Sequence, residues 1–135
     1  MIVLDTNVLV SGLLQPFGVP GEIVRLVAAE RITLYYDARV MAEYREVLHR
    51  DKFRFNQRHL EQLLDQIKRC GELVTASPLF KRLPDPDDEM FLEIALAAKA
   101  KYLVTGNLQH FPDSAMVNNV LVLSPKAFLD KYRNR

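Results

Sequence analysis

The segment Ile2-Val3-Leu4-Asp5-Thr6-Asn7-Val8-Leu9 decides the fold that we expect for this chain. Its apolar run at residues 2–4 is too short for a helix and is typical of a buried strand in a parallel sheet. The Thr-Asn pair that follows the run is a signal for the start of a helix. Asp5 should therefore lie at the carboxyl end of a strand, which is the edge where open α/β sheets bind ligands.

The rest of the chain alternates between strand-like and helix-like segments. Further strands are predicted at residues 32–36, near 73–74, at 102–105 and at 120–123, and helices at 8–14, 22–30, 39–50, 57–70, 90–100 and from 125 onward. Because parallel neighbours need crossover connections, this alternation predicts helices packed against a parallel sheet. We therefore expect a single three-layer α/β/α domain that spans residues 1–135.

Composition narrows the class of protein further. Apolar residues make up 49% of the 135 residues and charged residues 26%, which is ordinary for a globular domain. The net charge of +1 provides no global attraction to nucleic acid or to membranes. Cys70 is the only cysteine, which excludes an internal disulfide, and no apolar stretch reaches membrane-spanning length. We expect a cytoplasmic protein with no membrane association.

Two acidic side chains besides Asp5 are candidates for a functional site. Glu43 lies at the edge of the apolar stripe of a predicted helix, although an ordinary boundary glutamate would fit there too. In the run Asp85-Pro86-Asp87-Asp88-Glu89, capping of the next helix explains most of the charges, with Asp85 as the N-cap. Asp88 differs because its helical spacing to the following apolar positions directs it to the buried side, where a lone carboxylate is costly.

A fourth polar position, Asn107, follows a predicted strand as Asp5 does, although Gly-Asn is also common in turns. The α/β layout places Asp5, Glu43, Asp88 and Asn107 at one edge of the sheet. Two carboxylates about 4 Å apart repel by roughly 4 kcal/mol at an effective dielectric constant near 20, so three need a cation or a bound proton at neutral pH. Hard oxygen ligands suit Mg²⁺ or Mn²⁺, and phosphodiester hydrolysis is the natural chemistry of such a site.

Four short motifs together resemble the PIN domain family. They are Val3-Leu4-Asp5-Thr6-Asn7-Val8-Leu9, the isolated Glu43, Leu83-Pro84-Asp85-Pro86-Asp87-Asp88-Glu89-Met90-Phe91-Leu92-Glu93, and Tyr102-Leu103-Val104-Thr105-Gly106-Asn107. In this order they cover essentially the whole chain and are similar to bacterial PIN proteins described as toxins of toxin–antitoxin pairs, akin to VapC-type ribonucleases. The resemblance implies a five-stranded parallel sheet between helices and metal-dependent cleavage of single-stranded RNA.

The resemblance also implies roles for individual residues. It makes Asp5, Glu43 and Asp88 the acids that would hold Mg²⁺ or Mn²⁺, with Asn107 at a fourth catalytic position. Glu89 is a competing match for the third acid. In this scheme Asp5 and Asp88 hold the metal, while Glu43 and Asp88 orient the attacking water or help to deprotonate it. Asn107 completes the shell, but because it is neutral a second metal would bind weakly or only with substrate.

Accessory residues and partners follow from the same resemblance. Thr6 and Thr105 match hydroxyls that position a phosphate or water, and Asp85 matches an accessory acid. The family implies an RNA substrate, a cognate antitoxin protein and a homodimer. A catalytically weak PIN-fold module that binds RNA or a protein stays open, because Asn107 replaces a fourth acid. A phosphatase is less well supported, since Asn7 stands where the pattern Asp-x-Asp needs an aspartate.

A basic and aromatic segment offers a candidate surface for RNA. Arg50, Lys52 and Arg54 surround Phe53 and Phe55. Cationic side chains contact phosphates, and aromatic rings stack on unpaired bases. The segment would equally fit a solvated junction between two helices that the two phenylalanines anchor to the core.

Overall fold

The structure, a computed structural model, describes residues 1–112 and 116–135, in which short strands alternate with helices. The strands are β1 (Val3–Leu4), β2 (Tyr35–Tyr36), β3 (Glu72–Leu73), β4 (Tyr102–Val104), β5 (Met116–Val117) and β6 (Val120–Leu123). The α-helices are α1 (Thr6–Leu14), α2 (Val19–Ala28), α3 (Ala38–Leu48), α4 (Gln57–Cys70), α5 (Glu89–Ala98) and α6 (Pro125–Arg133). Three single turns of 3₁₀-helix are η1 (Asp51–Phe53), η2 (Pro86–Asp88) and η3 (Leu108–His110).

The strands pair in two sheets. In the larger sheet the order is β1-β4-β6-β5, where β1, β4 and β6 are parallel and β5 is antiparallel to β6. The smaller sheet pairs β2 with β3 in parallel, and an isolated parallel bridge between Ile2 and Leu34 links the two sheets. The continuous five-stranded parallel sheet that we expected is therefore divided in the described part of the chain. The physical reason is that β1 and β2 are each only two residues long. They do not form a ladder with each other, and only the residues directly before them, Ile2 and Leu34, pair at the bridge.

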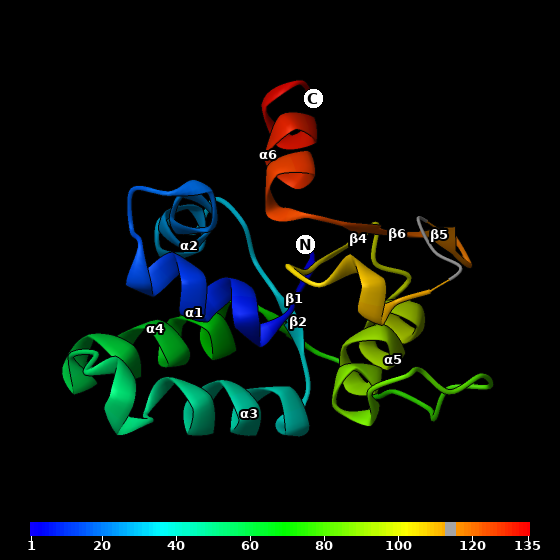
Figure 1. Cartoon of the computed structure of the whole chain (residues 1–135), viewed down its shortest axis with the longest axis horizontal. Helices are drawn as coiled ribbons and strands as arrows, with labels where there is room; N and C mark the ends of the chain where they lie inside the picture. Colours follow the sequence, from blue (N-terminus) through cyan, green and yellow to red (C-terminus); the bar gives the residue numbers. More distant parts are fainter. Residues whose placement is uncertain (113–115) are drawn as a thin grey trace.

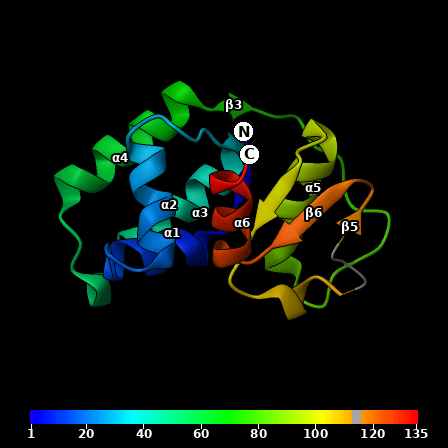
Figure 2. The ribbon, with the colours of Figure 1, turned by 90° about the horizontal axis from the view of Figure 1, so that it is seen from above.

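Helices cover the strands from both sides. In Figure 1, α6 lies above β4 and β6 and α5 lies below them, while α1 to α4 gather beside β1 and β2. Seen from above in Figure 2, α6 lies between the group α1 to α4 on one side and β4, β6 and α5 on the other. Contacts agree with this view, because α5 packs on β1, β2 and β4, and α6 on β4 and β6. No helix in the described ranges is long and apolar enough to cross a membrane.

The middle of the core is formed by β1 and β4. Val3, Leu4, Leu103 and Val104 are all fully buried, as expected for strands that are covered on both faces. The parallel register pairs Val3 with Leu103 and Leu4 with Val104, so the two strands end side by side. The residues that follow these strands are consequently neighbours in space.

The predicted elements agree best with the structure where local signals are strong. The helix predicted at 57–70 has these same ends in α4, because its buried residues recur at helical spacing and the Asn56 side chain caps its first turn. Helix α2 begins at Val19, earlier than predicted, because Pro20 fits the first turn of a helix. Strand β2 is shorter than predicted, and β5 has no counterpart in the prediction.

Candidate functional site

Asp5 lies where we predicted, directly after the end of β1. Because β1 and β4 are parallel neighbours, Thr105 lies beside it, and Thr105 Oγ1 donates to Asp5 Oδ2 at 2.8 Å. Asp5 is also the N-cap of α1, where its Oδ1 accepts from the Asn7 N–H at 3.4 Å. The residue is 3% exposed, and this burial raises the pKa of Asp5.

Glu43 reaches the same edge of the sheet from α3. The hydroxyl of Thr6, the residue after Asp5, donates to Glu43 Oε2 at 2.5 Å. The buried Tyr44 hydroxyl donates to the Leu4 carbonyl at 2.5 Å, which ties α3 to the end of β1. Burial raises the pKa of Glu43, and the negative charge of Asp5 also raises it. Glu43 and Asp5 thus form an acidic pair connected through Thr6.

Asp88 is the last residue of η2 and lies beside His110. Asp85 caps this turn by accepting from the Asp87 N–H at 2.9 Å, in agreement with its predicted capping position. Asp88 Oδ2 lies 3.0 Å from His110 Nδ1, which is the distance of an ion pair when the imidazole is protonated, and both atoms are buried. Potential ligand atoms of Asp85, Asp88 and His110 all lie within 4.8 Å of one another.

The sequence allowed His110 to face the site but assigned it no role, and the structure brings it to Asp88. It is a lone histidine without a partner at metal-ligand spacing in the sequence, so no local pattern connects it to an acid. The turn η3 after β4 brings it back toward η2. The available signal was its position, three residues beyond Asn107.

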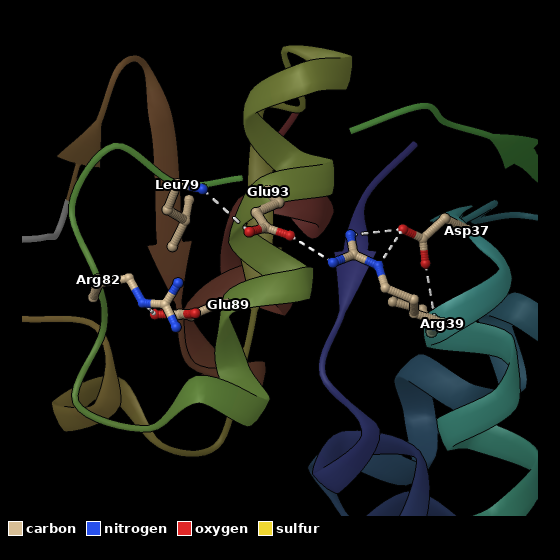
Figure 3. Close-up of polar contacts among 7 residues, drawn as sticks. Asp37, Arg39, Leu79, Arg82, Glu89 and Glu93 are labelled. Atoms are coloured by element: carbon tan, nitrogen blue, oxygen red, sulfur yellow. Dashed lines mark hydrogen bonds and ion pairs between the residues drawn. The ribbon is translucent and has the colours of Figure 1, made fainter. Parts of the chain in front are cut away.

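The side chains of Asp88 and Glu89 have different neighbours. Burial is the largest cause that raises the pKa of Asp88 to about 6, followed by the negative charge of Asp5. Glu89 instead accepts from the Leu83 N–H at 2.9 Å, and it pairs with Arg82 of the loop before η2 at 3.4 Å, the pair that Figure 3 shows. Of the two competing matches for the third acid, Asp88 is therefore the one that shares its electrostatic environment with Asp5.

Asn107 borders the acids from the side of β4. Its backbone N–H donates to Thr105 Oγ1 at 3.0 Å, so one hydroxyl connects Asn107 to Asp5. Its half-buried side chain lines a hollow of about 290 Å³ together with Asn7 and Ser11 of α1. All four predicted polar positions thus come from elements that meet at this end of the sheet.

A groove of about 370 Å³ lies between α3 and α5. Its lining includes Arg39 and Glu43 from α3 and Glu89 and Glu93 from α5. Arg39 pairs with Asp37 at 2.8 Å and with Glu93 at 2.6 Å, which ties the two helices together (Figure 3). Sequence reasoning missed this tie, although a glutamate within a nearly apolar helix was an available signal.

The basic residues predicted to contact RNA lie away from this groove. Arg50, Lys52 and Arg54 belong to the connection between α3 and α4, at the end of α3 that is distant from α5 (Figures 1 and 2). Arg50 pairs with Glu46 at 3.0 Å, and the two phenylalanine rings of the segment stack with their centroids 5.4 Å apart. The structure does not bring these cations to the acids, and their contact with RNA stays a prediction.

The three acids suit a hard divalent cation. The charge of Asp5 raises the pKa of both Glu43 and Asp88, which means that the ionised groups repel one another. A bound cation would relieve this repulsion, and carboxylate oxygens are ligands that Mg²⁺ and Mn²⁺ prefer. The buried Asp88 Oδ2, which faces His110 Nδ1 at 3.0 Å, is an oxygen that such an ion could use.

Similarity to known proteins extends over most of the chain. The model of the PIN domain family matches residues 1–109. The chain is also 27% identical to the protein "Uncharacterized protein MJ1680" of Methanocaldococcus jannaschii, over 97% of this chain and 90% of that protein. No solved structure gives a significant match. Because the family model covers well over half of its length, this chain belongs to the PIN domain family.

Proposed function

We propose that this protein is an endoribonuclease that depends on Mg²⁺ or Mn²⁺ and cleaves single-stranded RNA. The observation that supports this most is the convergence of Asp5, Glu43 and Asp88, three acids with raised pKa values, at one edge of the sheet. Membership of the PIN domain family, whose proteins are generally nucleases that use divalent metals, supports the same chemistry.

Each acid has its own role in this proposal. Asp5 and Asp88 would hold the cation, with the Asp5 carboxylate oriented by the Thr105 hydroxyl that donates to it. When bound, the cation would stabilise the negative charge that develops on the phosphate. Glu43 would accept a proton from the attacking water, because its carboxylate lies at the same edge of the sheet as Asp5. The Thr6 hydroxyl keeps the Glu43 carboxylate in place.

Three neighbouring residues would assist these acids. Asp85 and His110, whose potential ligand atoms lie within 4.8 Å of one in Asp88, are accessory positions for the cation or its water shell. Asn107 would contribute a neutral amide to the substrate from the hollow that it lines beside α1. A neutral group at that position favours a single tightly bound cation.

The proposal is tested by measuring cleavage of a labelled single-stranded RNA. The wild-type protein is assayed with Mn²⁺ and with EDTA, and the Asp5→Asn and Asp65→Asn variants are assayed with Mn²⁺. Asp65 is an exposed acid on α4 and serves as the matched control. We expect cleavage with Mn²⁺ only, a loss of about 100-fold or more in Asp5→Asn, and wild-type rates in Asp65→Asn, with the same far-ultraviolet circular dichroism for all. Cleavage that persists in EDTA or in Asp5→Asn would contradict the proposal, and RNA binding without cleavage would favour a catalytically weak binding module.

We also propose that the protein is the toxin of a toxin–antitoxin pair and acts as a cytoplasmic homodimer. The support is the similarity of its motifs to those of bacterial PIN toxins. Expression of the wild-type protein in a bacterial host should arrest growth, and Asp5→Asn should not. Co-expression of a small protein encoded beside its gene should relieve the arrest. Undisturbed growth with soluble wild-type protein would refute the toxin role, and a monomer in sedimentation experiments would refute the dimer.

A further inference from the structure

The loop between β3 and η2 presents an aromatic and two basic side chains on the side of α5 that faces away from α3 and the acidic groove (Figures 1 and 3). We call residues 79–83 of this loop the Phe80 arch. We propose that the Phe80 arch is a subsite for single-stranded RNA, in which Phe80 stacks on an unpaired base and Arg82 contacts a neighbouring phosphate. The inference rests on the proposed function, because its ligand is the same RNA.

Two carboxylates of α5 hold both ends of the Phe80 arch. Glu93 accepts from the Leu79 N–H at 3.1 Å (Figure 3), and Glu89 accepts from the Leu83 N–H at 2.9 Å. Both glutamates are buried, so these charge-assisted hydrogen bonds form in a place where they are stronger than in water. The three residues between the anchors are thereby fixed before any ligand binds, which lowers the entropy cost of binding.

The side chains between the anchors face solvent. Phe80 is fully exposed, and Arg82 keeps 76% of its side chain exposed although its Nε lies 3.4 Å from Glu89. A single exposed phenylalanine is common on protein surfaces and would by itself mean little. Here it stands beside Lys81 and Arg82, and an aromatic ring next to cations is the combination that binds single-stranded nucleic acid.

Charge explains why the RNA would need a cationic contact at this place. The run from Asp85 to Glu89 carries four acids, and Glu43 faces it across the groove, so the site itself repels a phosphate backbone. The Phe80 arch directly precedes this run in the chain. Arg82 and Lys81 would offset the repulsion at the border of the site without entering it.

The arch is also physically continuous with the proposed catalytic groups. The Glu93 carboxylate accepts from Leu79 of the arch through one oxygen and from Arg39 of the groove through the other. Glu89, which holds the other end of the arch, directly follows Asp88. A base stacked on Phe80 would therefore lie on a loop that is anchored to the same helix, α5, that forms one wall of the groove.

The chain provides a matched control in Phe17, which is almost as exposed as Phe80. Phe17 follows the carboxyl-terminal end of α1, whereas Asp5 lies at the other end of that helix. Its ring already has the Arg25 guanidinium 5.9 Å from its centroid. Loss of Phe17 removes a similar apolar area without touching the arch.

The experiment measures binding of a short fluorescein-labelled single-stranded RNA by fluorescence anisotropy in EDTA, so that cleavage cannot occur. We expect Phe80→Ala to weaken binding by about 10-fold or more, as for loss of one base stack. Phe80→Trp should retain binding, because it keeps a stacking surface, and Phe17→Ala should bind like the wild type. Arg82→Gln should lower the slope of log Kd against log salt by about 0.7, whereas Arg31→Gln, an exposed change elsewhere, should not.

The outcomes separate this inference from the proposed function. Equal binding by Phe80→Ala and the wild type, or equal losses in Phe80→Ala and Phe17→Ala, overturns the subsite even if the protein cleaves RNA with Mn²⁺. Weaker binding by Phe80→Ala that Phe80→Trp restores supports the subsite even if no cleavage is found. Absence of RNA binding by the wild-type protein also overturns the subsite.

Discussion

Replacement of Asp88 by asparagine should stabilise the protein in the absence of metal ions. In the folded chain the pKa of Asp88 is raised from 3.8 to about 6, first by burial and then by the charge of Asp5. A shift of one unit corresponds to about 1.4 kcal/mol, so the ionised side chain costs about 3 kcal/mol of stability above pH 7. Because Asp88 keeps some contact with solvent, we expect Asp88→Asn to gain about 2 kcal/mol.

The direction of the pH dependence follows from proton binding. The folded protein holds the Asp88 proton more tightly than the unfolded chain, so it binds more protons between about pH 4 and pH 6. The favourable contribution of protonated Asp88 is therefore complete below pH 4 and is lost as the pH rises through 6. The advantage of Asp88→Asn should be largest near neutral pH and should nearly vanish at about pH 4.

Urea unfolding in EDTA, followed by circular dichroism near pH 7.5 and near pH 4, measures this effect. Asp65→Asn, a change of an exposed acid on α4, should alter stability by less than about 0.5 kcal/mol at both pH values. Calorimetric titration should show that Asp88→Asn has lost Mn²⁺ binding, because the substitution removes a proposed ligand. The same substitution would thus raise the free energy of unfolding and abolish metal binding. A variant that is no more stable than the wild type near pH 7.5, or equally stabilised at both pH values, would refute the reasoning.

Three further substitutions probe the support around the site. Thr105→Val removes the hydroxyl that donates to Asp5 and should weaken Mn²⁺ binding by about 10-fold in calorimetry; unchanged affinity would exclude this orienting role. Tyr44→Phe leaves the buried Leu4 carbonyl without this donor and should lower the free energy of unfolding by about 1–2 kcal/mol, and an unshifted urea midpoint would contradict it. Gly71→Ala places a Cβ 2.3 Å from a backbone carbonyl oxygen and should destabilise by about 1–3 kcal/mol; unaltered thermal unfolding would show that the backbone yields there.

Local sequence signals account for much of the fold. The ends of α4 follow from its apolar period and its Asn56 cap. The burial of β1 follows from its continuous apolar run, because a strand with one face in solvent would alternate apolar and polar residues. The meeting of Asp5 and Thr105 also follows, because parallel strands end at the same edge of a sheet. The division of the sheet does not, since the pairing of β1 with the segment before β2 depends on backbone contacts between distant residues.

The sequence by itself determined the alternation of elements and the edge at which the acids gather, because helical and strand periods and capping are local properties. The choice of Asp88 over Glu89 as the neighbour of Asp5, the approach of His110 to Asp88, and the carboxylate of Glu93 that joins the groove to the Phe80 arch were decided only by the tertiary structure. These contacts join residues from separate elements, and no spacing in the chain encodes which polar atoms meet once those elements pack.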